Sequence, residues 1–100
     1  MNSVGVKFKG KVWLYEGKAA WHFVSLPKRL SASIQKNFCF MKRGWGSLRV
    51  TVTVGKSTWK TSIFPDKRSG TYLLPLKAEA RVKEKVTAGE TRSFAIEIDV

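Results

Sequence analysis

The chain has 100 residues, 43% of them hydrophobic, with one cysteine and a formal net charge of +12. We expect one domain with its own core, since a chain of this length buries roughly two-thirds of its unfolded surface. The single Cys39 excludes an internal disulfide and favours a reducing compartment, and the lack of a long apolar run excludes a membrane span. We therefore expect a soluble cytoplasmic protein with no membrane partner.

The first half of the chain predicts three strands and a helix. The expected strands cover 4–15, 21–25 and the later part of 43–55, and the expected helix covers 26–38. Hydrophobic residues alternate with polar ones in the strands, as half-buried strands require. Leu30, Ile34 and Phe38 recur every four residues along one helical face, and Pro27 suits a first helical turn.

The second half predicts the same elements in the same order. The expected strands cover 58–64, 71–74 and 92–100, and the expected helix covers 76–86. Turn residues separate them, and Pro65 is expected to end the first of these strands. Ala78, Val82 and Val86 recur at four-residue intervals and are expected to form the buried face of the helix.

The two halves predict an internal duplication. The Leu-Pro pair at 26–27 recurs at 74–75, and the hydrophobic positions of each helix and each last strand follow at corresponding offsets. We interpret 1–100 as one domain made of two strand–strand–helix–strand repeats, 4–55 and 57–100. The expected fold is mainly β: a six-stranded barrel with two short helices, because closure removes exposed edge strands. An open α+β sandwich is the alternative.

Four stretches occur in order along most of the chain. They read AWHFVSLP (20–27), RGWGSLRV (43–50), WKTSIFP (59–65) and GTYLLPLK (70–77), with Arg81 following. Together they resemble a small bacterial family, the domain of unknown function 1905 family. The resemblance implies a double-split β-barrel, the class used by AbrB-type transition regulators and MazE-type antitoxins. There two short chains make one barrel, so this chain resembles a fused pseudo-dimer, which we expect to be monomeric. The family has no established activity, so the resemblance implies none, and a shared fold alone does not imply DNA binding.

Positive charge is concentrated in the first half. Residues 1–50 hold ten bases and one acid, whereas residues 51–100 hold nine bases and six acids. Clustered charge favours a polyanionic partner more than a uniform excess does. The alternative is a surface charge that only keeps the protein soluble.

Lysines alternate along the first strand. Lys7, Lys9 and Lys11 are expected to share its outer face at intervals of about 6.6–6.8 Å. Such a row can follow a phosphate backbone, and Trp13 continues the same face and could stack on a base. Alternatively, these lysines protect a strand edge, and pairing of the terminal strands would place the acids of the last strand beside them.

A second candidate site surrounds the two glycines of the stretch RGWG. Arg43, Trp45 and Arg49 flank them, and glycine-rich backbone beside arginines can hold a phosphate. No helix follows, so the pattern is not a P-loop or dinucleotide fingerprint, and Trp45 covering a barrel end is the alternative. Lys60 lies near the basic loop 66–70, a third candidate contact surface.

The sequence offers little for catalysis. His22 stands between two aromatic residues and Cys39 among apolar ones, which favours structural roles, and no metal-ligand spacing is present. We expect no catalytic residue, no metal and no cofactor. An enzyme would need His22 to face a cleft beside a carboxylate.

We therefore expect a non-enzymatic barrel that binds DNA or RNA with weak sequence preference through phosphate neutralisation. The residues expected to form its binding surface are Lys7, Lys9, Lys11, Trp13, Arg43, Trp45, Arg49 and Lys60. The alternative is a protein-interaction or small-ligand module with no nucleic-acid role, whose pocket would be lined by Trp and Phe.

Overall fold

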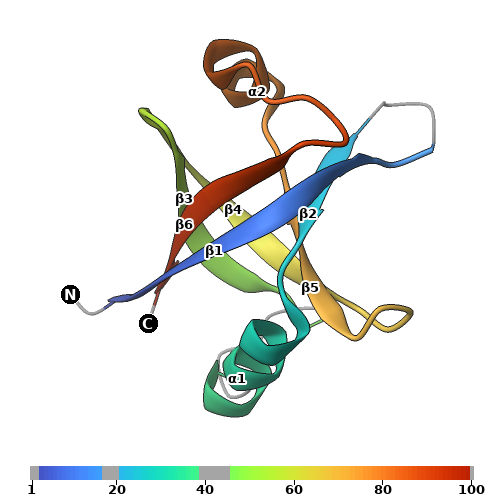
Figure 1. The fold of residues 1–100 in the computed structure, drawn as a ribbon. Coiled ribbons are helices and arrows are strands. Elements are labelled where there is room, and N and C mark those ends of the chain that lie inside the picture. Colours follow the sequence, from blue (N-terminus) through green and yellow to red (C-terminus); the bar gives the residue numbers. More distant parts are fainter. Residues whose placement is uncertain (1–2, 17–20, 39–45, 100) are drawn as a thin grey trace.

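The six strands of the protein close into an antiparallel barrel (Figure 1). The computed structural model describes residues 3–16, 21–38 and 46–99. The strands are β1 (Ser3–Leu14), β2 (His22–Ser25), β3 (Leu48–Val54), β4 (Ser57–Asp66), β5 (Thr71–Pro75) and β6 (Thr91–Asp99), and the helices are α1 (Lys28–Phe38) and α2 (Ala78–Glu84). Around the barrel the strand order is β1-β2-β5-β4-β3-β6. The predicted mainly β barrel with two helices is confirmed, and the open sandwich is excluded.

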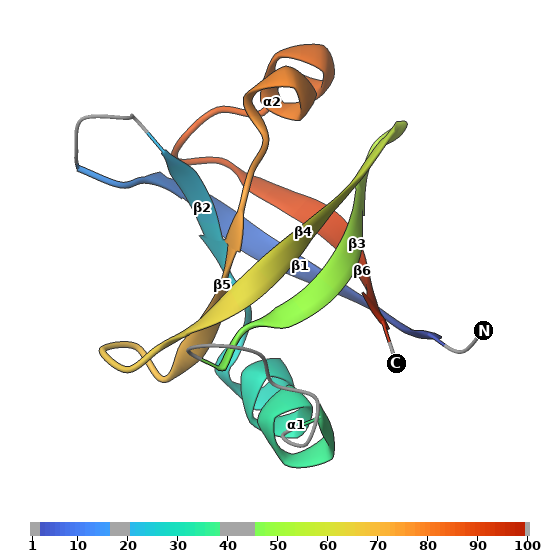
Figure 2. The ribbon, with the colours of Figure 1, turned by 180° about the vertical axis from the view of Figure 1, so that it is seen from behind.

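The strand order is unchanged when the two halves of the chain exchange places. Exchanging β1 with β4, β2 with β5 and β3 with β6 reproduces every neighbouring pair of the barrel. The helices lie beyond opposite ends of the barrel, α1 at one end and α2 at the other (Figures 1 and 2). No helix within the described residues is long and apolar enough to cross a membrane. The strand order supports a duplication, and the repeat boundaries stay a prediction.

Each of the two longest strands changes partner along its length. β1 pairs with β6 over Ser3–Lys11 and with β2 over Val12–Leu14. β4 pairs with β3 over Ser57–Ile63 and with β5 over Phe64–Asp66. Neighbouring strands therefore separate at two places in the barrel wall, as the name double-split barrel implies. One of these places, between β4 and β5, holds a pocket.

Alternate residues of the strands fill the barrel interior. The predicted inward residues that are buried are Leu48, Val50, Val52 and Val54 on β3 and Phe94, Ile96 and Ile98 on β6. The Phe94 ring stacks on Phe8 of β1, with ring centroids 5.7 Å apart. Burial of each large apolar side chain contributes about 1.5–3 kcal/mol. The core thereby determines which residues of each strand face the solvent.

Helix α1 is held against β5 by two hydrogen bonds with Tyr72, one to the buried hydroxyl of Ser31 and one from the Tyr72 hydroxyl to Oε1 of Gln35. The N–H of Ser31 bonds to the carbonyl of Pro27 over 2.8 Å, so Pro27 stands at the start of the helix as predicted. Ile34, on the predicted inner face, is buried. The Oγ of Ser31 accepts a hydrogen bond of 3.0 Å from the backbone N–H of Tyr72. This bond joins the first turn of α1 to the barrel wall.

Helix α2 ends two residues earlier than predicted and buries a different face. Lys85 adopts a left-handed conformation, φ 55°, which ends the helix. Val82 is 77% exposed and Ala78 is also exposed, whereas Ala80 is buried. The predicted inner face is therefore wrong. The chain turns at Lys85, and Val86 reaches the core from beyond the helix.

Pro65 does not end β4, contrary to the prediction. The strand continues to Asp66, and Pro65 lies opposite Tyr72 of β5. The N–H of Tyr72 donates to the Oγ of Ser31, and its carbonyl accepts from the N–H of Leu26. Because the backbone groups of Tyr72 bond elsewhere, β5 needs no donor from β4 at this position. A proline, which has no N–H, is tolerated in a strand at such a position.

Candidate functional site

The lysines of β1 form the predicted row on the outside of the barrel. Lys7, Lys9 and Lys11 are exposed, and the β6 residues opposite them are neutral. β1 pairs with β6, so the predicted pairing of the terminal strands is confirmed. Glu97 lies diagonal to Lys7, and Asp99 lies beyond it. Acidic residues therefore stand beside one end of the row and leave the other end without an acidic neighbour on β6.

Arg49 and Lys60 lie on the outer surface of β3 and β4, on the far side of β6 from β1. Both residues are exposed. Lys60 stands opposite Thr51 on β3, and Thr51 stands opposite Glu97 on β6. Glu97 thus lies between these two bases and the lysines of β1. Among the described residues, Glu97 therefore divides the predicted bases into two groups.

Trp13 has a structural partner on the neighbouring strand. Its Nε1 donates a hydrogen bond of 3.0 Å to the Oγ of Ser25, and its ring lies 5.2 Å from the Phe23 ring, centroid to centroid. The side chain is thereby fixed, and part of it stays open to solvent. Arg43 and Trp45, the other predicted pair, lie outside the described residues.

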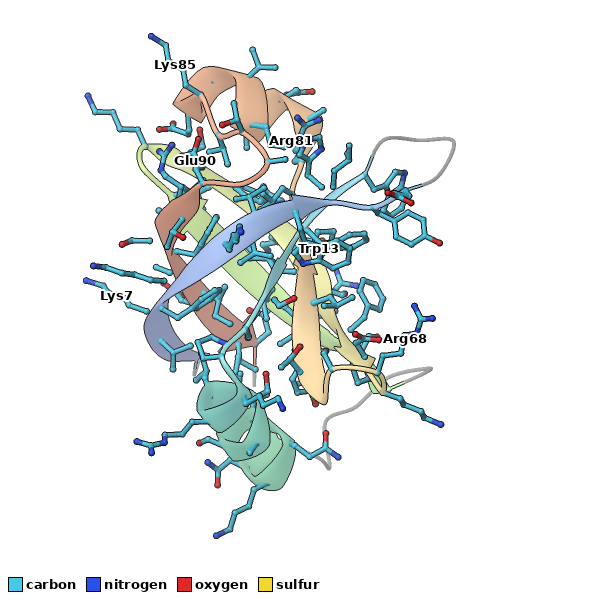
Figure 3. The ribbon with its side chains drawn as sticks, turned by 45° about the vertical axis from the view of Figure 1, so that its right-hand side comes forward. Lys7, Trp13, Arg68, Arg81, Lys85 and Glu90 are labelled. Carbon is cyan, nitrogen blue, oxygen red and sulfur yellow. The ribbon has the colours of Figure 1, made fainter. Side chains whose placement is uncertain are left out.

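A hollow of about 430 Å³ adjoins two of the β1 lysines. Lys7 and Lys9 stand at its rim, and the rings of Phe8 and Phe94 contribute to its wall. Both lysines are exposed, so water already solvates their ammonium groups. Figure 3 shows Lys7 and Arg68 projecting from opposite sides of the barrel. This hollow therefore offers a ligand two exposed lysines.

A second pocket opens where β4 separates from β5, and its volume is about 420 Å³. Its lining residues are Trp21, His22, Trp59, Lys60, Thr61, Pro75, Leu76, Lys77, Ala78 and Arg81. The β4 residues 59–61 pair with β3 alone. After Pro75 the chain leaves the barrel wall for α2. We name this space the α2 pocket.

Cationic side chains from three elements line the α2 pocket. Lys60 comes from β4, Lys77 precedes α2 and Arg81 lies within it. No carboxylate is found among the described residues that line the pocket. Lys77 approaches Glu79 at 4.0 Å, but both side chains are largely exposed, so this ion pair offsets little of the charge. The pocket is therefore electropositive.

The Nε of Arg81 is enclosed and has no hydrogen-bond partner within the described part of the chain. Buried donors are nearly always bonded, because an unmet one costs about 1–3 kcal/mol and more when charged. The backbone of Arg81 is fixed, since its N–H bonds to Lys77 (3.0 Å) and its carbonyl accepts from Val86 (2.9 Å). Figure 3 shows Arg81 at the side of α2 that faces the strands. Arg81 also lines the α2 pocket, so the residue contributes positive charge there, whereas its Nε is closed to solvent.

Aromatic rings continue from the α2 pocket onto the outer surface of β1 and β2. Trp59 and Trp21 both line the pocket, and Trp21 is 55% exposed. The Trp21 ring lies 5.9 Å from the Phe23 ring, and the Trp13 and Tyr15 rings lie 5.2 and 6.1 Å from it. We name Trp13, Tyr15, Trp21 and Phe23 the aromatic patch. The patch joins the pocket through Trp21, which belongs to both.

The sequence pattern predicts Lys60 in a binding surface but misses Lys77 and Arg81. Two signals point to the pocket: Trp21 and Trp59 each have a lysine within three residues, and Arg81 follows the last of the four resembling stretches. Trp21 and Arg81 line one pocket because β2 pairs with β5, a long-range pairing that no local pattern reveals. His22 lines the pocket among cations. The expectation of a non-enzymatic protein stays a prediction.

Comparison with known proteins identifies a family and no activity. No curated protein matches the sequence. The model of a family described as a domain of unknown function (DUF1905) matches residues 8–96. The match runs from β1 to β6 and includes every residue of the α2 pocket. It confirms the resemblance seen in the sequence, and the chain belongs to the DUF1905 family.

Proposed function

We propose that the protein binds a polyanion, and nucleic acid in particular, at the α2 pocket without catalysing a reaction. The observation that carries this proposal is the meeting of Lys60, Lys77 and Arg81 at one pocket whose described lining residues include no carboxylate. A phosphate oxygen is the acceptor whose charge and geometry suit a guanidinium group best. Lys60 and Lys77 at the same pocket would neutralise neighbouring phosphates.

Contacts of this kind read the backbone of a nucleic acid and not its sequence. Arginine and lysine bonded to phosphates fix the register of the ligand, whereas sequence is read from the base edges. Apart from its lysines and Arg81, the α2 pocket offers few hydrogen-bonding side chains for base edges, Thr61 and His22 among them. We therefore expect weak sequence preference and an affinity that falls steeply as salt is added.

The row of Lys7, Lys9 and Lys11 has a supporting role in this proposal. These three lysines do not line the α2 pocket, so each contributes mainly long-range attraction to a ligand bound there. Arg49 lies on the other side of Glu97 and acts in the same way. We expect these residues to raise the rate of association more than they slow dissociation.

A small anionic ligand is the second candidate. The volume of the α2 pocket, about 420 Å³, falls within the range of small-molecule sites, roughly 300–1,000 Å³. Trp21 and Trp59 would then enclose a planar group while Arg81 holds its charge. A mononucleotide that binds as tightly as an oligonucleotide would favour this candidate.

Fluorescence anisotropy with labelled duplex DNA, single-stranded DNA and RNA tests the proposal. We expect micromolar binding that weakens steeply between about 50 and 200 mM salt. The variant Lys77→Gln/Arg81→Gln should bind at least about tenfold more weakly, since charged hydrogen bonds contribute about 1.5–3 kcal/mol. The control Arg29→Gln/Lys36→Gln removes the same charge from exposed positions of α1, at the opposite end of the barrel.

Two results would overturn the proposal. One is no binding of any nucleic acid at low salt. The other is an equal loss of affinity in the pocket variant and in the α1 control, which would show that only net charge matters. Circular dichroism of the Lys77→Gln/Arg81→Gln variant and of the α1 control checks that both fold, so that weak binding is not ascribed to unfolding.

A further inference from the structure

We infer that the aromatic patch is a base-stacking surface, so that the nucleic acid bound at the α2 pocket is single-stranded. This inference rests on the proposed function and adds the class of ligand. Phe23 lies at the centre of the patch, and the rings of Trp13, Tyr15 and Trp21 lie 5.2 to 6.1 Å from it, centroid to centroid. Aromatic side chains of this kind stack on unpaired bases whatever their sequence.

The patch is exposed, and one of its rings is held by a hydrogen bond. Tyr15 is 54% exposed and Trp21 is 55% exposed, which is unusual for large aromatic side chains that adjoin one another. Beneath them, Trp13 and Phe23 are paired across β1 and β2, and Trp13 is bonded to Ser25. Trp13 is therefore held in place before any ligand arrives, and little conformational entropy is lost when a base stacks on it.

Cationic residues lie on two sides of the patch. Lys11 precedes Trp13 by two residues on the same face of β1, at about 6.6–6.8 Å along the strand. On the other side, Trp21 lines the α2 pocket together with Lys77 and Arg81. Flat apolar rings between cations suit a chain that alternates planar bases with phosphates.

This arrangement favours a single strand over the other occupants of an apolar surface. In a duplex the bases are already stacked on one another, so it can offer phosphates to Arg81 but no free base to Trp21. An apolar peptide would cover the rings and leave the cations without partners. A single strand satisfies both kinds of group.

The test compares a labelled oligothymidylate with duplex DNA of equal phosphate content at one salt concentration. We expect the single strand to bind more tightly, and we expect Trp21→Ala and Tyr15→Ala each to weaken it roughly 5- to 150-fold. Duplex affinity should be unchanged in Tyr15→Ala, whose side chain does not line the α2 pocket. Circular dichroism confirms folding, which these two exposed side chains should not affect.

Two controls separate stacking from general apolar contact. Tyr15→Phe keeps the ring and should retain the affinity for oligothymidylate. Leu14→Ala removes a neighbouring aliphatic side chain that is 47% exposed, and it should also bind normally. A loss in Leu14→Ala as large as that in Tyr15→Ala would contradict a stacking surface.

The outcomes distinguish this inference from the proposed function. If duplex and single strand bind equally and the aromatic variants bind normally, while Lys77→Gln/Arg81→Gln weakens both, the stacking surface is wrong and the polyanion site stands. If neither nucleic acid binds at low salt, both proposals are overturned.

Discussion

The Oγ of Ser57, at the start of β4, donates a hydrogen bond of 2.7 Å to the Glu84 carboxylate at the end of α2. The same carboxylate accepts the backbone N–H of Lys56 over 3.3 Å. Gly55 has φ +57°, and a Cβ there would collide with Glu84, so glycine leaves the space that this contact uses. These contacts tie the end of α2 to the β3–β4 turn and so position the helix that carries Arg81.

Replacing Glu84 should loosen this connection. We expect Glu84→Ala to lower the free energy of unfolding by about 1–3 kcal/mol, because two donors lose a charged acceptor, and to weaken oligonucleotide binding. Urea unfolding and anisotropy measure the two effects. Glu79→Ala is the matched control on the same helix, where an exposed side chain should change stability by no more than about 0.5 kcal/mol. Equal stability of the two variants would contradict this account of α2.

A second prediction concerns the hydroxyl that joins α1 to β5. Ser31→Ala leaves the backbone N–H of Tyr72 without its acceptor in a buried position, so we expect a loss of about 1–3 kcal/mol. Ser33→Ala removes an exposed hydroxyl from the same helix and should have little effect. Thermal unfolding followed by circular dichroism measures both. A Ser31→Ala protein as stable as the Ser33→Ala protein would mean that water replaces the missing acceptor.

Two glycines on β1 test how tightly the barrel is packed, because an added Cβ would clash at only one of them. A Cβ at Gly10 would overlap Cγ1 of Val24 on β2, whereas a Cβ at Gly5 would meet Cγ of Glu97 at 3.9 Å, an ordinary contact. We expect Gly10→Ala to destabilise the protein by about 1–3 kcal/mol through overpacking and Gly5→Ala to be tolerated. Chemical denaturation of the two variants checks this. Similar stabilities would show that β1 and β2 move apart easily.

The stability of the barrel should fall in acid through Glu90. The Arg92 guanidinium, bonded to the Glu90 carboxylate at 2.9 Å, and hydrogen bonds from Thr87 lower the pKa of Glu90 from 4.5 to about 2. Because the folded pKa is the lower one, the unfolded chain takes up the proton first. The stabilisation is complete above about pH 4.5 and is lost as the pH falls toward 2.

The variant Glu90→Gln tests this assignment. Its unfolding free energy should depend less on pH between about 4.5 and 2 than that of the parent protein. Glu79→Gln is the control, because its exposed carboxylate makes only a long contact of 4.0 Å with Lys77. If both variants keep the acid dependence of the parent protein, another group is responsible for it.

The strands were predictable because side-chain alternation is a property of the strand itself. The inward set on β3 and the outward lysines Lys7, Lys9 and Lys11 follow from parity alone, and the structure confirms both. The inner face of α2 was not predictable from periodicity. The left-handed conformation of Lys85 ends the helix, and Val86 beyond it is buried in the core. The pattern of hydrophobic residues does not predict this turn of the chain.

The α2 pocket could be predicted only in part. The sequence predicts Lys60 as a binding residue from its charge and its position on a strand. Arg81 and Trp21 line the same pocket only because β2 pairs with β5 and the chain then continues to α2. Contacts between distant parts of a chain depend on the order of the strands, which alternation does not determine. For the same reason, parity could not show that Glu97 separates Lys60 from the lysines of β1.

The most direct test of the polyanion site follows the Arg81 Nε–H resonance by NMR while isotope-labelled protein is titrated with short single-stranded DNA. We predict a saturable shift of this resonance, together with the indole N–H signals of Trp21 and Trp59, and no shift of the Arg29 Nε–H on α1. Binding that leaves the Arg81 signal in place, or that moves the Arg29 signal equally, would contradict a site at the α2 pocket.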